Sequence, residues 1–255
     1  MRNKVRRTDT GVTVDFTGPL VNDERAKLYQ WMGMDHICPG DITDAIGMAG
    51  GRPLTLRMNS PGGDLHAGVE MYTRLMDYPG QVTVDILSIS ASASSVVAMV
   101  SAKQGNRCRV SPLGMMVIHN VQTKAEGDYR EMESTAQHLR QANSAIITAY
   151  RKKTGMEEAQ LQEMLDKETW LTAGDAVKMG FADEVMFEEG EPQADDRTVT
   201  AVMARTRELV NAIPSFDQET IQRVLEAKHQ EDAAKDMEDQ FQAAARLLEL
   251  EQNRF

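Results

Sequence analysis

Three short segments in the first half of the chain contain the residue types that acyl-transfer chemistry uses. They are Asn59-Ser60-Pro61-Gly62-Gly63, Ser90-Ala91-Ser92-Ala93-Ser94-Ser95 and Val117-Ile118-His119-Asn120. A serine hydroxyl becomes a useful nucleophile when an imidazole takes its proton, and a carboxylate can hold that imidazole in place. Backbone N–H groups in a glycine turn or in the first turn of a helix can stabilise an oxyanion. The three segments together predict a serine nucleophile, a histidine base and an oxyanion site.

Ser92 is the first candidate for the nucleophile. It follows an apolar strand pattern and precedes the apolar run Val96-Val97-Ala98-Met99, which places it at the first turn of a predicted helix. The oxyanion or substrate-binding site is expected to include Gly62, Gly63 and Ala93, with the N–H groups of Gly63 and Ala93 as donors. Three neighbouring serines remain competing nucleophiles, with Ser94 the second choice: Ser90, Ser94 and Ser95.

Each of these residues also has an ordinary structural interpretation. A serine in a small-residue turn usually forms local hydrogen bonds, and a histidine at a strand end is usually packed there. What favours catalysis is the occurrence of the whole set in one order. Four other histidines have no companion motif and are predicted to lie on the surface: His36, His66, His138 and His229.

The elements that must position these residues follow from the apolar patterns. Alternating residues predict strands over 12–16, 54–58, 82–87, 115–118 and 181–187. Helical periodicity predicts helices over 64–78, 92–102, 130–153, 157–165 and 172–177, the first of them capped by Asp64. Strands that alternate with helices indicate an α/β fold with a largely parallel sheet.

Composition limits the classes of protein that need to be considered. The 255 residues contain two cysteines, too few for a disulfide framework or a zinc site, and no apolar run long enough to span a membrane. The basic N-terminus lacks the apolar stretch of a secretion signal, so we expect a cytoplasmic protein. The formal net charge of −11 is concentrated in the tail, where residues 186–255 contain 8 Lys/Arg and 16 Asp/Glu. This sign argues against nucleic-acid binding.

The tail also differs from the rest of the chain in its pattern. We predict a domain over residues 1–187, an acidic linker over 188–200 and an acidic helical extension over 201–255. A stripe of apolar residues on the predicted helix 130–153 is expected to pack against more than the chain's own sheet, and it consists of Met132, Leu139, Ile146 and Tyr150.

The order of the motifs resembles that of ClpP-type serine peptidases. Ser60-Pro61-Gly62-Gly63 matches the family's Ser-Pro-Gly-Gly turn in full. Gly63 precedes Ser92 by 29 residues, the spacing expected in the family, and His119 follows Ser92 by 27 residues. The nucleophile turn departs from the family's Gly-x-Ala-Ala-Ser, because Ser88 replaces the glycine and Ser90 replaces an alanine. The resemblance spans residues 12–185.

This resemblance implies a fold class and an activity. The fold would be α/β, a ClpP/crotonase-like spiral of repeated β-β-α (strand–turn–helix) units with a long handle helix and a helical C-terminal extension. The activity would be that of a serine endopeptidase with a Ser-His-Glu/Asp triad inside a ring-shaped homo-oligomer, with stacked heptameric rings by family resemblance. We expect protein or peptide substrates, a separate ATP-driven unfoldase or capsid proteins as partners, and no nucleic acid, membrane, cofactor or metal.

The third member of the triad departs from the family, which has an aspartate at the position of Glu168. Glutamate can orient an imidazole if its backbone lies about one methylene further away. Asp166 remains the alternative. The segment Glu-Thr-Trp-Leu-Thr-Ala over 168–173, together with Ile-His-Asn, is most similar to sequences of ClpP-related head-maturation proteases of tailed phages. Those proteases process capsid or scaffold proteins.

Two other functions are compatible with the same fold. The chain could be a catalytically inactive scaffold or assembly protein. The departures from the family pattern at Ser88, Ser90 and Glu168 would then be the result of a loss of activity. It could also be a crotonase-type acyl-CoA enzyme, which uses an oxyanion hole without a Ser-His pair. Labelling of Ser92 by a fluorophosphonate, lost in His119→Ala, would support the peptidase.

Overall fold

The computed structural model describes residues 4–187 and, in a second unit formed by residues 214–255, the helical residues 223, 226, 227 and 230. The predicted linker 188–200 and nearly all of the predicted extension 201–255 therefore lie outside the described residues. Among the described residues, no helix has both the length and the apolar character needed to cross a membrane.

The strands form one sheet in the order β1-β2-β3-β4-β5-β8, with β6 paired to β4 and β7 paired to β6. Neighbouring strands are parallel except for β1 with β2 and β6 with β7. The strands are β1 (Val5–Arg7), β2 (Val12–Thr17), β3 (Leu54–Ser60), β4 (Val82–Ala91), β5 (Arg107–Val110), β6 (Met115–Ile118), β7 (Thr169–Thr172) and β8 (Glu184–Val185).

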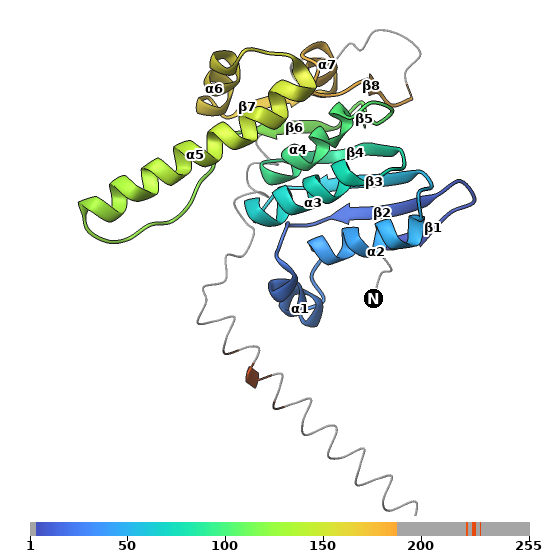
Figure 1. Ribbon diagram of the computed structural model, residues 1–255, viewed down its shortest axis with the longest axis horizontal. Coiled ribbons are helices and arrows are strands. Elements are labelled where there is room, and N and C mark those ends of the chain that lie inside the picture. The colour runs from blue at the N-terminus through green and yellow to red at the C-terminus, as the bar shows by residue number, and fades with distance from the viewer. Residues whose placement is uncertain (1–3, 188–222, 224–225, 228–229, 231–255) are drawn as a thin grey trace, which may run out of the picture. The chain divides into compact units, whose positions relative to one another are not determined.

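Seven helices and one 3₁₀ turn connect the strands within residues 4–187. They are α1 (Asp23–Trp31), α2 (Pro39–Ala49), α3 (Leu65–Asp77), α4 (Ala93–Ala98), the 3₁₀ turn η1 (Met99–Ala102), α5 (Tyr129–Thr154), α6 (Glu158–Asp166) and α7 (Ala173–Lys178). In Figure 1, α2, α3 and α4 lie over one face of the sheet, and the N-terminal part of α5 extends away from it.

Alternation along the strands separates the two faces of the sheet. In β3, Leu54, Leu56 and Met58 are fully buried under the helices, while Arg57 points to the opposite, open face. The same alternation occurs in β2 and in the first half of β4. Burial of this apolar face is the main driving force for assembly of the sheet and helices.

The mixed α/β architecture and most of the predicted elements are confirmed. Asp64 caps α3 as predicted, because its carboxylate accepts the N–H groups of His66 and Ala67. The structure adds β1, α1, α2, β5 and β7, which the sequence patterns did not predict, and the strand expected over 181–187 is reduced to β8.

Candidate active site

Ser92 lies between the end of β4 and the start of α4 in a backbone conformation that is unusual for serine. Its φ of 54° and ψ of −130° fall outside both strand and helix geometry. Such a conformation costs on the order of 1–3 kcal/mol and persists where the surrounding structure holds it. The Ser92 N–H donates to the carbonyl of Val117 at 2.9 Å, which ties the turn to β6. The half-buried Ser92 side chain therefore projects from a sharp strand-to-helix turn.

The three competing serines are fully buried, and their hydroxyls have other partners. Ser94 Oγ lies 2.9 Å from the carbonyl of Ser60 and 2.7 Å from that of Ala91. Ser90 Oγ contacts the sulfur of Met58 at 2.9 Å. Of the four serines in this turn, Ser92 is the one with access to solvent, which favours it over Ser94.

The glycine turn lies directly against the serine turn. A Cβ atom at Gly62, where φ is +92°, would lie 2.5 Å from the Ala91 oxygen and 2.6 Å from Ser92 Cβ. The Gly62 N–H donates to Ser60 Oγ at 3.2 Å, and Ser60 Oγ donates to the carbonyl of Gly18 at 2.7 Å. The missing side chain of Gly62 therefore allows the two turns to pack closely, while its N–H forms a hydrogen bond within its own turn.

Gly63 and Ala93 supply the remaining N–H groups beside Ser92. Ala93 is the first residue of α4, and N–H groups in the first turn of a helix have no acceptor within that helix. Among the described residues, no hydrogen-bond acceptor is found for the Gly63 N–H. A Cβ at Gly63 would lie 2.3 Å from the Leu20 oxygen, so a glycine is required here. Two N–H groups in such a position can receive a developing oxyanion.

His119 is the residue immediately after β6, just as Ser92 is the residue immediately after β4. Because β4 and β6 are neighbouring parallel strands, both residues leave the same edge of the sheet. Nδ1 of His119 lies 2.7 Å from the carbonyl oxygen of Asn120. A carbonyl can only accept, so Nδ1 carries the proton and Nε2 is left with a lone pair in the neutral ring. The half-buried imidazole thus has the tautomer that a base needs.

Glu168 reaches the same edge from the other side of β6. The antiparallel register of β6 with β7 ends at the pair Ile118 and Thr169, and His119 and Glu168 each lie one residue beyond that pair. The register thus brings both residues to the same end of the β6–β7 pair, although neither belongs to the ladder itself. Glu168 has a positive φ of 49°, and its Oε1 accepts the indole N–H of Trp170 at 3.2 Å. Ser92, His119 and Glu168 therefore each adjoin the end of one of three successive strands, β4, β6 and β7.

Asp166, the alternative third member, has a different environment. Its exposed carboxylate accepts the side-chain amides of Asn120 and Gln162, each at 2.8 Å. These hydrogen bonds, that of Asn120 first, lower the pKa of Asp166 below its ordinary value. Asn143 also donates to Asn120, at 2.8 Å. Asp166 thus anchors the loop that follows His119 through Asn120.

The other described histidines and the two cysteines have different environments. The prediction that His36 is a surface residue is wrong: it is 6% exposed, because its ring packs near Tyr29 and bonds the Met34 carbonyl. His66 and His138 are exposed as predicted, and His229 lies outside the described residues. Both cysteines, Cys38 and Cys108, are free and buried.

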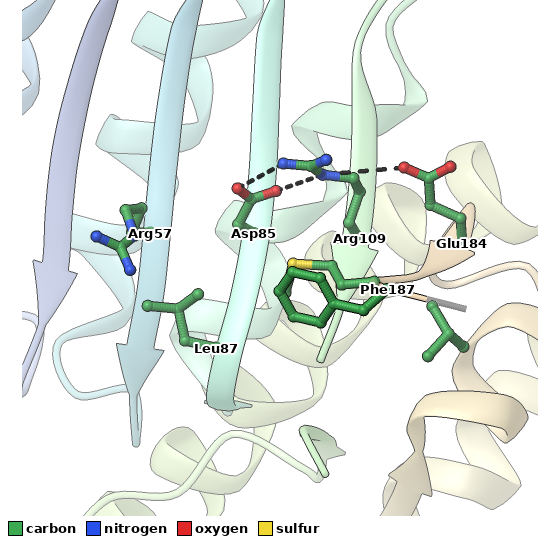
Figure 2. Close-up of a pocket in the computed structure, with 8 residues that line it drawn as sticks. Arg57, Asp85, Leu87, Arg109, Glu184 and Phe187 are labelled. Atoms are coloured by element: carbon green, nitrogen blue, oxygen red, sulfur yellow. Dashed lines mark hydrogen bonds and ion pairs between the residues drawn. The ribbon is translucent and has the colours of Figure 1, made fainter. Parts of the chain in front are cut away.

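A hollow of about 440 Å³ lies on the open face of the sheet, at the ends of β5 and β8. Figure 2 shows Arg109 between Asp85 and Glu184, its guanidinium bonded to both Asp85 oxygens at 2.7 and 2.8 Å. The exposed side chains of Leu87 and Phe187 border the same hollow. The sequence analysis did not identify this hollow, because its charges come together only through strand register.

The same register aligns charged residues of opposite sign across five neighbouring strands of the open face. Each residue is the cross-strand neighbour of the next, so positive and negative charges alternate. This alternating row consists of Asp15, Arg57, Asp85, Arg109 and Glu184. Its members are carried by five different strands.

Comparison with known proteins places the candidate site within a described family. The model of the Clp protease family matches residues 47–189, more than half of the chain and all of the candidate site residues. An ATP-dependent Clp protease proteolytic subunit of Bacteroides fragilis is 27% identical over 176 residues, covering 68% of this chain and 79% of the relative. Proteolytic subunit 1 of Protochlamydia amoebophila is 28% identical over 145 residues, covering 55% and 69%. Subunit 1 of Chlamydia abortus is 25% identical over 139 residues, covering 54% and 71%.

Proposed function

This chain belongs to the Clp protease family, and we propose that it is a serine endopeptidase with Ser92 as nucleophile, His119 as general base and Glu168 as the residue that orients His119. The observation that carries this proposal is the position of Ser92, which has a positive φ of 54° at a strand-to-helix turn beside β6, the strand that His119 directly follows. The match to the Clp protease family favours neither an acyl-CoA enzyme nor an inactive scaffold.

The reaction proceeds in two acyl-transfer steps. Ser92 Oγ attacks the carbonyl carbon of the scissile peptide while His119 Nε2 takes the hydroxyl proton. The N–H groups of Gly63 and Ala93 stabilise the tetrahedral oxyanion. His119 then gives the proton to the departing amine, and an ester on Ser92 remains. Water deprotonated by His119 attacks that ester, which releases the new carboxyl terminus and restores the Ser92 hydroxyl.

Ser92→Ala tests the nucleophile. Hydrolysis of unfolded casein should fall on the order of 10⁴-fold or more, and labelling by a fluorophosphonate should be lost, because no hydroxyl remains at the turn. Ser144→Ala, on the exposed surface of α5, is the matched control and should retain both. Retained labelling in Ser92→Ala, with loss in Ser94→Ala, would contradict the assignment.

Glu168→Gln and Asp166→Asn test the orienting role. Because Glu168 extends the register that ends beside His119, while Asp166 bonds Asn120, Glu168→Gln should lower kcat far more than Asp166→Asn. Both changes preserve side-chain size, so the comparison isolates the carboxylate charge. The reverse ranking would transfer the orienting role to Asp166.

We also propose a ring-shaped homo-oligomer of stacked heptamers that contact one another through the N-terminal half of α5. There Tyr129 is 71% exposed and Met132 is 36% exposed, an arrangement that a partner surface would cover. The expectation that Ile146 and Tyr150 pack against more than the chain's own sheet is wrong, because both are buried in the chain's own core. Met132→Glu should therefore dissociate the assembly in sedimentation without unfolding the chain. Wild-type protein that sediments as an active monomer would refute the ring.

The partners and substrates follow from the relatives and from the resemblance. The relatives are named as proteolytic subunits of ATP-dependent proteases, which supports a separate ATP-driven unfoldase as partner. The residues at 168–173 support the more specific role of processing phage capsid or scaffold proteins. Activity on folded substrate that requires an added unfoldase would favour the first role, and cleavage of a capsid precursor by the isolated assembly would favour the second.

A further inference from the structure

A chain of two hydrogen bonds connects helix α5 to the turn that contains Ser92. The hydroxyl of Tyr150 lies 2.8 Å from Ser95 Oγ, and Ser95 Oγ lies 2.6 Å from the carbonyl oxygen of Ser92. Tyr150 and Ser95 are both fully buried, at 1% and 0% exposure. The Tyr150–Ser95 bond is therefore shielded from solvent, and the Ser95–Ser92 bond is partly buried.

The direction of each bond follows from the donors available. Ser95 has one hydroxyl proton, and a carbonyl can only accept, so Ser95 donates to Ser92 and Tyr150 donates to Ser95. Burial raises the pKa of the Tyr150 phenol above its ordinary value, which keeps the phenol protonated as a donor. Each donor polarises the next, so the two bonds strengthen one another in the low-dielectric interior.

A hydrogen bond to the Ser92 carbonyl restrains the backbone of the nucleophile itself. This carbonyl also accepts the N–H of Ser95 at 2.9 Å, while the Ser92 N–H is held by Val117. These contacts fix the peptide planes on both sides of Ser92 and so fix its unfavourable φ and ψ. The direction of the Ser92 Oγ follows from that backbone conformation.

We propose that Tyr150 and Ser95 are positioning residues that hold Ser92 in its reactive conformation and make that conformation depend on the placement of α5. This inference rests on the proposed function, because it takes Ser92 as the nucleophile. Neither residue touches substrate; each acts through the Ser92 backbone. Since α5 contributes Tyr150 at its buried end and Met132 at its exposed end, a shift of the helix would be transmitted to the turn.

The test removes single hydroxyl groups. Tyr150→Phe deletes the first donor without changing the ring that packs edge-on against Phe181, and Ser95→Ala deletes the second. Tyr78→Phe is the matched control, because Tyr78 is 2% exposed and its hydroxyl donates to a different backbone carbonyl, that of Arg52. The readouts are thermal unfolding, kcat and KM on a fluorogenic peptide, and the rate of fluorophosphonate labelling of Ser92.

We expect Tyr150→Phe to lower kcat and the labelling rate about tenfold with little change in KM, since the loss concerns nucleophile orientation and not substrate binding. Tyr78→Phe should lower thermal stability to a similar extent and leave the labelling rate unchanged. In the Ser95→Ala background, Tyr150→Phe should have no further effect on labelling, because the chain is already broken.

Two results would overturn the inference. One is equal labelling rates for Tyr150→Phe and Tyr78→Phe; the other is independent, multiplicative effects of Ser95→Ala and Tyr150→Phe. If Ser95→Ala fails to fold, the comparison of the two tyrosine variants decides alone. Failure of the proposed function has a separate signature, because Ser92→Ala would then retain activity or labelling whatever the tyrosine variants do.

Discussion

Gly62→Ala tests the close packing of the glycine turn on the serine turn. The backbone of Gly62 has a φ of +92°, a region that costs a residue with a Cβ about 1–2 kcal/mol. In addition, the new Cβ would lie 2.5 Å from the Ala91 oxygen and 2.6 Å from Ser92 Cβ. Strain and displacement therefore act together at this one position.

The expected magnitude follows from the distance that must open. Ordinary van der Waals contact begins at 3.4 Å, so the two turns must separate by about 0.9 Å, and a misplacement of about 1 Å can cost on the order of 10²-fold in rate. Gly62→Ala should thus lower kcat roughly 10²-fold and destabilise the fold by at least the 1–2 kcal/mol of backbone strain.

Gly105→Ala is the matched control for the backbone strain. Its φ of +87° is close to that of Gly62, but nothing lies within 4 Å of the added Cβ. Urea unfolding should show a loss of about 1–2 kcal/mol in Gly105→Ala, while hydrolysis of a fluorogenic peptide remains at the wild-type rate. If Gly62→Ala has the same activity as Gly105→Ala, the glycine turn does not hold Ser92 and the argument from packing is refuted.

Three other predictions follow from buried groups. Burial lowers the pKa of His36, so as the pH falls the His36 imidazole is protonated in the unfolded chain before it is protonated in the folded one. The free energy of unfolding should therefore decline below about pH 6.5. Urea titrations should show that His36→Gln removes this decline. Burial raises the pKa of Cys38 and Cys108 to about 12, so a disulfide reagent at pH 8 should react with them only after denaturation. Asp85→Asn should destabilise the fold by about 1–3 kcal/mol, because it weakens the bidentate pair with Arg109. Glu184→Gln should destabilise it by less than about 1 kcal/mol, because the contact of Glu184 with Arg109 is exposed. Thermal unfolding of both variants checks this difference.

Elements with a strong local pattern could be predicted from the sequence, and those formed by packing could not. α3 has a regular apolar stripe and a capping aspartate, and its predicted limits agree with the structure to within one residue. α2 begins with Pro39, which suits the first position of a helix, but it contains Gly40 and Gly47, which disfavour a helix, so its burial against the sheet contributes to its conformation. β8 has two residues, too few for a pattern, and depends on pairing with β5.

The same distinction applies to the candidate site. Ser92 and His119 could be predicted because each directly follows a strand whose pattern is visible in the sequence. The position of Glu168 opposite His119 depends on the β6–β7 register, and the anchoring role of Asp166 depends on a contact between distant loops. Tyr150 was identified as part of an apolar stripe, but its partner Ser95 lies 55 residues away and no local pattern joins them.

The alternating row on the open face has a consequence for how this sequence can change over time. Every inner member of the row has a neighbour of opposite sign on each side. Reversing one charge would therefore create two repulsive contacts at once, and a second reversal beside it would relieve only one of them. In an alignment of relatives that keep the row, the signs at positions 15, 57, 85, 109 and 184 should covary, whereas the sizes of the core residues between them can drift separately.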